Sequence, residues 1–403
     1  MKRAALASAA VLALLAGTGV LGAQETKPIK LGLSAALTGP FNEFGEGLRR
    51  GAEVAIDEWN EAGGVLGRKV EFSEVLDDQL VPDRAVQNIR RILDDPEVVA
   101  LIAPGPSGPT VASLGMVVAD GRPMCNAEAQ TPTIVHPNGP DAPPYPNVYS
   151  VAISLPAEGK RLAKILIENF DNIGLISEST SYGKLGAGYV KQYALEMKSD
   201  ATVTSETYNQ RAQDMTAQLV RLQSAGAKVI VLVGFGADAS VVRKTMTRLN
   251  IDLPLYGMSG LATMPFMEGA GELAIGARAT QATAFGSRPI PPRVQAFLDR
   301  YRKRWGLDRW YGPDVDNPNV TMAGLVAAAY DCVNVLLDGI KRAGSTEAKS
   351  IIAALDQTKE LPGVMVPSIS FTPEKHSAFD PRDLGIYEIK KIGDTMRLEV
   401  VEK

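Results

Sequence analysis

The stretch VVALIAPGPSGPTVAS (residues 98–113) joins a wholly apolar run to a Gly/Pro/Ser loop, after which apolar residues resume. Such a run is typical of a parallel-sheet strand that is covered on both faces. The loop places Ser107 where a predicted strand at 98–103 turns into a predicted helix at 108–120. A loop of this kind can serve three chemistries: a nucleophilic serine, a phosphate cradle, or the capture of a small anion.

The same strand–loop–helix pattern fills the first part of the chain from Lys27 onward. Strands are predicted at 29–37 and 69–78, with an amphipathic helix between them that ends at Gly63-Gly64. The next helix begins at Pro82, which suits a first helical turn. Alternation of strands and helices predicts a parallel sheet and the α/β class.

A second series of the same pattern follows residue 149. Its predicted strands are NIGLISES, ATVTSETY, AKVIVLVG and LPLYGM, and helices begin near residues 183, 215 and 238. Between the two series lies HPNGPDAPPYPNVY (136–149), whose Pro, Gly and Asn residues indicate a linker or crossing segment. The sequence therefore predicts two doubly wound parallel-sheet lobes.

The C-terminal part predicts repeated crossing between these lobes. Long amphipathic helices are expected at 291–306, 319–343 and 345–358, and the tail reads as short strands. A chain that ends in this way is expected to cross three times, near residues 149, 260 and 367. The predicted first lobe is 24–149 plus 260–366, and the predicted second lobe is 150–259 plus 367–403.

The N-terminus predicts export. Lys2 and Arg3 precede a short uncharged Ala/Leu/Val/Gly stretch that ends in VLGAQ, which is typical of a signal peptide, here residues 1–23. The first cysteine is Cys125, so no lipid anchor is expected and the mature chain is expected in the periplasm. Cys125 and Cys332 lie far apart in the sequence and are interpreted as two separate buried thiols, with pairing in an oxidising compartment as the alternative.

Composition and motifs exclude several functions. A net charge of −4 with no basic run argues against a nucleic-acid partner. GPSGP lacks the last glycine of a hydrolase elbow, and only His136 and His376 could act as its base. GFGADA (234–239) lacks an acidic residue at the end of the next strand, so a tight turn is preferred to a dinucleotide site. DVDNPN (314–319) lacks the later residues of a calcium loop. No metal, cofactor or enzymatic activity is therefore predicted.

A ligand cleft is the function that these exclusions leave. In open parallel sheets, ligands bind beyond the carboxyl ends of the strands, where free N–H groups at helix starts favour an anion. APGPSGPT lies at such a place. We expect this loop to hold a carboxylate rather than to attack one.

Several segments together resemble the leucine/isoleucine/valine-type periplasmic binding proteins, which are the type I solute receptors of ABC importers. The resemblance covers about Lys27 to Ile389 and is carried by IKLGLSAALTGPFNEFGEGLRRGAEVAIDEWNEAGGVLGRKVEF, DDQLVPDRAVQNIRRILDD, VVALIAPGPSGPTVAS, ISESTSYGKLGAGYV and AGAKVIVLVGFGADASVVRKTM. It implies two α/β lobes with three hinge crossings, which close on a small ligand and deliver it to a membrane permease. It also implies a monomer.

The resemblance further implies ligand contacts in each lobe. In the first lobe Phe44 matches an aromatic wall, and Ser107 matches the serine that holds the ligand carboxylate. The segment NAEAQTP puts Glu128 and Gln130 at contact positions. In the second lobe Tyr182 matches an aromatic residue that covers the ligand.

Asp238 matches the acidic residue that pairs with the ligand's ammonium group, and its alternative role is a helix N-cap. Three features depart from the family pattern: Gln130 is longer than the usual hydroxyl residue, Glu128 adds a carboxylate, and Asp238 is shorter than the usual glutamate. These departures argue against a branched-chain aliphatic ligand and favour a smaller, polar or amide-bearing one. The alternatives are a receptor for an amide, urea or aromatic acid, a sensory ligand-binding module, and a secreted hydrolase.

Overall fold

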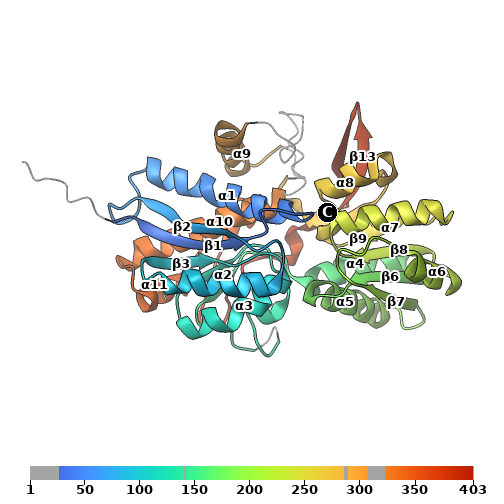
Figure 1. Ribbon diagram of the computed structural model, residues 1–403, viewed down its shortest axis with the longest axis horizontal. Coiled ribbons are helices and arrows are strands. Elements are labelled where there is room, and N and C mark those ends of the chain that lie inside the picture. The colour runs from blue at the N-terminus through green and yellow to red at the C-terminus, as the bar shows by residue number, and fades with distance from the viewer. Residues whose placement is uncertain (1–26, 140–141, 286–288, 307–322, 403) are drawn as a thin grey trace, which may run out of the picture.

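Two α/β lobes lie side by side in the computed structural model (Figure 1). The structure describes residues 27–139, 142–285, 289–306 and 323–402. The predicted signal peptide and the motif DVDNPN lie outside these residues, as does the start of the helix predicted at 319–343.

The first lobe contains a five-stranded sheet in the order β2-β1-β3-β4-β5, with every neighbouring pair parallel. Its strands are β1 (Ile29–Ala35), β2 (Val70–Asp77), β3 (Val98–Ile102), β4 (Met124–Asn126) and β5 (Val148–Ser150). The connecting helices are α1 (Asn42–Glu61), α2 (Pro82–Asp94) and α3 (Ser107–Asp120). All five residues of β3 are buried, as the apolar run predicts. Because β1 lies between β2 and β3, the order of the strands reverses there and leaves a crevice at their carboxyl ends.

The second lobe repeats this arrangement in a seven-stranded sheet, β14-β13-β10-β9-β8-β6-β7. Its parallel strands are β6 (Asn172–Glu178), β7 (Thr202–Tyr208), β8 (Val229–Val233), β9 (Leu255–Gly257) and β10 (Arg278–Ala282). Its helices are α4 (Leu155–Asn169), α5 (Ser181–Met197), α6 (Thr216–Ser224), α7 (Gly236–Arg248) and α8 (Met264–Ala270). The C-terminal strands β13 (Leu384–Ile392) and β14 (Thr395–Glu402) add an antiparallel hairpin beside β10.

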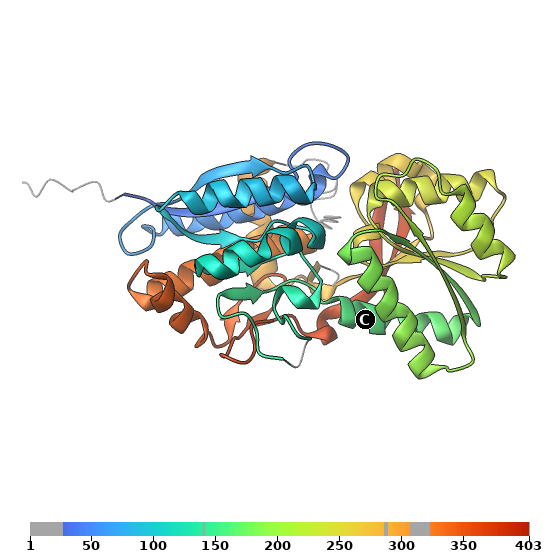
Figure 2. The ribbon, with the colours of Figure 1, turned by 60° about the horizontal axis from the view of Figure 1, so that its bottom comes forward.

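The chain crosses between the lobes three times, and two crossings differ from the predicted positions (Figure 2). The first follows β5, close to residue 149. The second follows β10 rather than residue 260, because β10 pairs with β9 in the second sheet. The third precedes β13 rather than lying near residue 367, because β12 (Ser368–Ile369) pairs with β11 (Leu361–Pro362) and Ser377 still bridges to Ser150 of β5. The sequence ARATQA at β10 has no long apolar run, which explains why it gave no strand signal.

The segment between the second and third crossings returns to the first lobe as α9 (Pro292–Trp305), α10 (Ala323–Ala343) and α11 (Ala348–Leu355). Helix α10 packs closely on α1. A Cβ atom at Gly51 would lie 1.9 Å from the carbonyl oxygen of Val326, so only glycine allows this approach. Among the described helices, none has both the length and the apolarity that a membrane span requires.

The two cysteines form a disulfide, which corrects the interpretation of two separate thiols. Cys125 of β4 and Cys332 of α10 have Cα atoms 5.5 Å apart, within the usual range for a bridge. The return of α10 to the first lobe brings them together across 207 residues of sequence. Sequence spacing alone carries no information on this approach.

Candidate functional site

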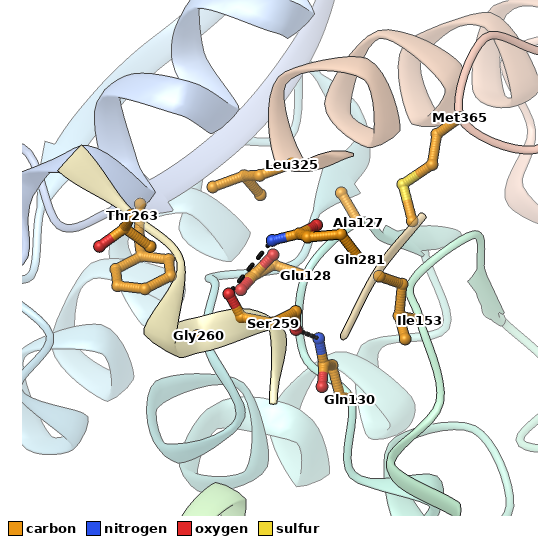
Figure 3. Close-up of a pocket in the computed structure, with 11 residues that line it drawn as sticks. Ala127, Glu128, Gln130, Ile153, Ser259, Gly260, Thr263, Gln281, Leu325 and Met365 are labelled. Carbon is orange, nitrogen blue, oxygen red and sulfur yellow. Dashed lines mark hydrogen bonds between the residues drawn. The ribbon is translucent and has the colours of Figure 1, made fainter. Parts of the chain in front are cut away.

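A pocket of about 400 Å³, partly open to solvent, lies between the two lobes (Figure 3). One part of its wall comes from the first lobe, with Phe44 on α1 and Glu128 after β4. The other part comes from the second lobe, with Ser259 and Gly260 after β9 and Gln281 on β10. The pocket therefore lies where the carboxyl ends of the parallel strands of both sheets meet, as expected for this architecture. This pocket, with all the residues that line it, is called the cleft pocket below.

Apolar side chains form one side of the cleft pocket: Phe44, Ala127, Ile153, Leu325 and Met365. Aromatic rings connect the two lobes at this side of the pocket, beginning with Phe44 itself. The Phe44 ring meets Phe235 of the second lobe edge-on, with centroids 5.0 Å apart, and Phe235 stacks on Tyr182 at 5.2 Å. This side can accommodate the apolar part of a small ligand.

Ser259 connects the polar residues of the site. Its hydroxyl accepts a hydrogen bond of 2.9 Å from Nε2 of Gln130, which links the two lobes, and its carbonyl oxygen accepts one of 3.2 Å from Nε2 of Gln281. Its backbone N–H donates to Oε1 of Glu158 at 2.9 Å. Thr280 also donates to that oxygen, at 2.6 Å. The position of Ser259 is therefore fixed by both lobes.

Glu128 brings a carboxylate into this pocket. Gly105, in the loop quoted at the outset, makes room for it, because a Cβ atom there would lie 2.9 Å from Cβ of Glu128. Burial raises the pKa of the Glu128 carboxyl group well above its usual range, and the nearby charges of Glu158 and Glu43 raise it further.

Ser107 lies at the predicted helix start, as the first residue of α3, and is completely buried. Its Oγ accepts hydrogen bonds from the backbone N–H groups of Gln130 and Thr131, at 3.1 and 3.3 Å. The hydroxyl thus fixes the loop that carries Glu128 and Gln130. Ser107 is not part of the pocket wall.

Tyr182 and Asp238 also lie behind the pocket wall rather than in it. The Tyr182 hydroxyl accepts a hydrogen bond of 3.3 Å from the Gly260 N–H. The Asp238 carboxylate accepts one of 3.0 Å from the Tyr208 hydroxyl. Burial raises the pKa of Asp238 to about 6. Of the six predicted residues, the structure places Phe44, Glu128 and Gln130 in the cleft pocket.

The other motifs have structural roles. GFGADA forms the turn from β8 into α7, where a Cβ atom at Gly236 would lie 1.9 Å from Oγ1 of Thr263. Nδ1 of His136 lies 2.7 Å from the Ala142 carbonyl oxygen, and Nε2 of His376 lies 3.0 Å from Oδ1 of Asp356. Within the described ranges, no three metal-ligating side chains come together.

Glu158, Ser259 and Gln281 are site residues that the sequence reasoning missed. Glu158 had a detectable signal. It lies on the buried face of α4 between Leu155 and Leu162, where an acidic residue interrupts an apolar helical stripe. Ser259 follows the short strand β9 and Gln281 lies within the short strand β10, both among small or polar neighbours, and periodicity gives no signal for them.

Comparison with known proteins agrees with this geometry. Residues 28–394 match the family model described as "Periplasmic binding protein". A periplasmic binding protein type 1 from Bordetella pertussis Tohama I has a similar structure, with a TM-score of 0.88 and 42% sequence identity, covering 93% of this chain and 100% of that one. A Leu/Ile/Val-binding protein of Rhizobium johnstonii is 25% identical over 83% of this chain and 85% of its own length.

A branched-chain amino acid transporter substrate binding protein from Streptococcus pneumoniae, solved in complex with isoleucine, has the same fold. Its TM-score is 0.76 at 21% identity, with 93% of this chain and 100% of that chain covered. The chain belongs to the periplasmic binding protein family, and its fold is the type I fold of that family. It is a solute-binding protein rather than an enzyme.

Proposed function

We propose that this protein is a periplasmic receptor that captures a small, amino-acid-like solute in the cleft pocket and delivers it to an ABC permease in the inner membrane. One observation carries the proposal: the pocket is built from both lobes at the carboxyl ends of both sheets. The names of the relatives, which include Leu/Ile/Val-binding proteins, support an amino-acid-like ligand. The predicted signal peptide supports export, and the receptor acts as a monomer.

The hinge crossings supply the mechanism. Two rigid lobes that are joined by short segments can rotate about them, and a ligand that contacts both lobes favours the closed arrangement. A micromolar ligand has about −8 kcal/mol of binding free energy, which exceeds an open–closed difference of a few kcal/mol. The permease could then distinguish the ligand-bound receptor from the empty one by its closed arrangement.

A thermal-shift screen followed by small-angle scattering tests this function. Amino acids, amides and aromatic acids are screened first, because a ligand at a hundred times its dissociation constant adds about 2.7 kcal/mol to the free energy of unfolding. The solute that protects the chain should then reduce its radius of gyration. No reduction at saturation would contradict the clamp mechanism.

A further inference from the structure

The cleft pocket has a marked charge asymmetry. Among its described lining residues, Glu128 is the only one with a charged side chain, and Figure 3 shows it in the middle of the group. The other polar side chains are the neutral Gln130, Ser259, Thr263 and Gln281. The described wall therefore offers one carboxyl group, which is negative when ionised, without a lysine, arginine or histidine to balance it.

The side-chain amides of the pocket are already engaged within the protein, whereas the Thr263 hydroxyl is buried without a partner among the described atoms. The side-chain amides of Gln130 and Gln281 both donate to Ser259, as the dashed lines in Figure 3 show. Oε1 of Gln130, by contrast, is buried and has no partner among the described atoms, and the residue is only 7% exposed. A buried acceptor without a donor is unfavourable, so this oxygen favours a ligand that brings an N–H group.

Ser107, the side chain expected to hold a carboxylate, is also engaged within the protein. The backbone N–H groups of Gln130 and Thr131 donate to Ser107, which lies outside the pocket wall. Asp238, which was expected to hold an ammonium group, accepts from Tyr208 instead. The features that would hold a carboxylate at one end of a zwitterion and an ammonium group at the other are therefore not those of the cleft pocket.

The surroundings of Glu128 also favour a positively charged ligand. The carboxyl groups of Glu43 on α1 and Glu158 on α4 act on it and, together with burial, raise its pKa. Oε2 of Glu158 is buried and has no hydrogen-bond partner among the described residues. Ionised Glu128 needs a counter-charge in this environment, and a bound cation would supply it.

We propose that the cleft pocket selects a small organic cation, whose ammonium or amidinium group pairs with Glu128 and donates to Oε1 of Gln130. Its apolar part lies against Phe44 and the other apolar wall residues, and a carboxylate on the ligand is dispensable. This inference rests on the proposed receptor function and specifies its ligand class.

Ligand sets that differ in charge at constant shape test the proposal. L-leucine, L-leucinamide and 4-methylpentanoate form one set, and L-alanine, L-alaninamide and propanoate form a smaller one. Calorimetric titration at neutral pH should show at least one of the two amides binding more tightly than its amino acid, and no binding of either anion. Glu128→Gln should weaken amide binding more than about 30-fold, because it removes one partner of a buried charge pair.

Glu71→Gln is the matched control, because it makes the same change at an exposed position on β2 and should leave the affinity unaltered. The proposal is overturned if the amino acids bind as tightly as their amides, if Glu128→Gln keeps the affinity, or if neither amide binds at millimolar concentration. Protection by a neutral or anionic solute, with compaction, would then leave the receptor function standing. No protection by any solute and no compaction would contradict both.

Discussion

Glu158 is a carboxyl group that lies completely inside the second lobe, in the first turn of α4. Two donors reach its Oε1, but burial dominates and raises its pKa to about 7. Glu128 and Tyr182 are the titratable groups whose pKa values its charge raises in turn. Ionisation of Glu158 therefore changes the electrostatic potential at the carboxyl group of Glu128 in the cleft pocket.

Ionisation of Glu158 should make stability depend on pH. In the unfolded chain a glutamate titrates near pH 4.3, so between about pH 4.3 and 7 the folded chain binds the extra proton. The free energy of unfolding should therefore fall as pH rises through this window, by on the order of 3 kcal/mol from this group. Urea unfolding at several pH values should show a shallower fall for Glu158→Gln than for the wild type. Parallel profiles would contradict this assignment.

The family pattern marked Phe44, Glu128 and Gln130 as expected ligand contacts, and these three residues line the cleft pocket. The sequence could not predict what the partners of each side chain would be. Asp238 lies in the first turn of α7, after the carboxyl end of β8, where a ligand contact is expected. Its carboxylate instead accepts a hydrogen bond from the hydroxyl of Tyr208, the last residue of β7. That contact depends on how β7 and α7 pack, and residue types along one segment do not reveal it.

At the scale of elements, period and turn residues predicted α1, α2 and α3 to within a few residues, and likewise the strands β1, β2, β3, β6, β7, β8 and β9, but gave no strand at β4, β5 or β10. The prediction was weakest where elements are short or mixed in composition. β10 has a polar pattern and joins the second sheet through pairing with β9 and β13, so its lobe is decided by non-local hydrogen bonds. The contact between β4 and α10, which the disulfide joins, likewise brings together residues far apart in the sequence.

Removing this disulfide should measure how firmly α10 is held to the first lobe. The double variant Cys125→Ala/Cys332→Ala should lose about 2–4 kcal/mol of unfolding free energy, because the bridge closes a long loop in the unfolded chain. Urea unfolding with and without a reducing agent provides the measurement. Reductant should lower the wild type to the level of the variant and leave the variant unchanged. Equal midpoints for the variant and the oxidised wild type would show that the bridge contributes nothing.

At the scale of the whole molecule, direct contacts between the lobes determine how readily they separate. Besides the Phe44–Phe235 pair and the Gln130–Ser259 hydrogen bond, Arg211 of the second lobe reaches across to the first. Its guanidinium group donates to the Gln79 carbonyl oxygen and lies 5.6 Å from the centre of the Phe41 ring. Arg211 is exposed and follows β7, so it can detach without disturbing either core.

Arg211→Ala should therefore shift the protein toward the open arrangement even without a ligand. The cation–π contact and the charged hydrogen bond together favour closure by about 1 kcal/mol at an exposed site, or roughly a fivefold change in the open–closed ratio. Small-angle scattering should show a larger radius of gyration for the variant than for the wild type. Arg221→Ala is the control, because Arg221 pairs with Glu206 inside the second lobe and its loss should leave the radius unchanged. If Arg211→Ala and the wild type scatter identically, the contact does not contribute to closure.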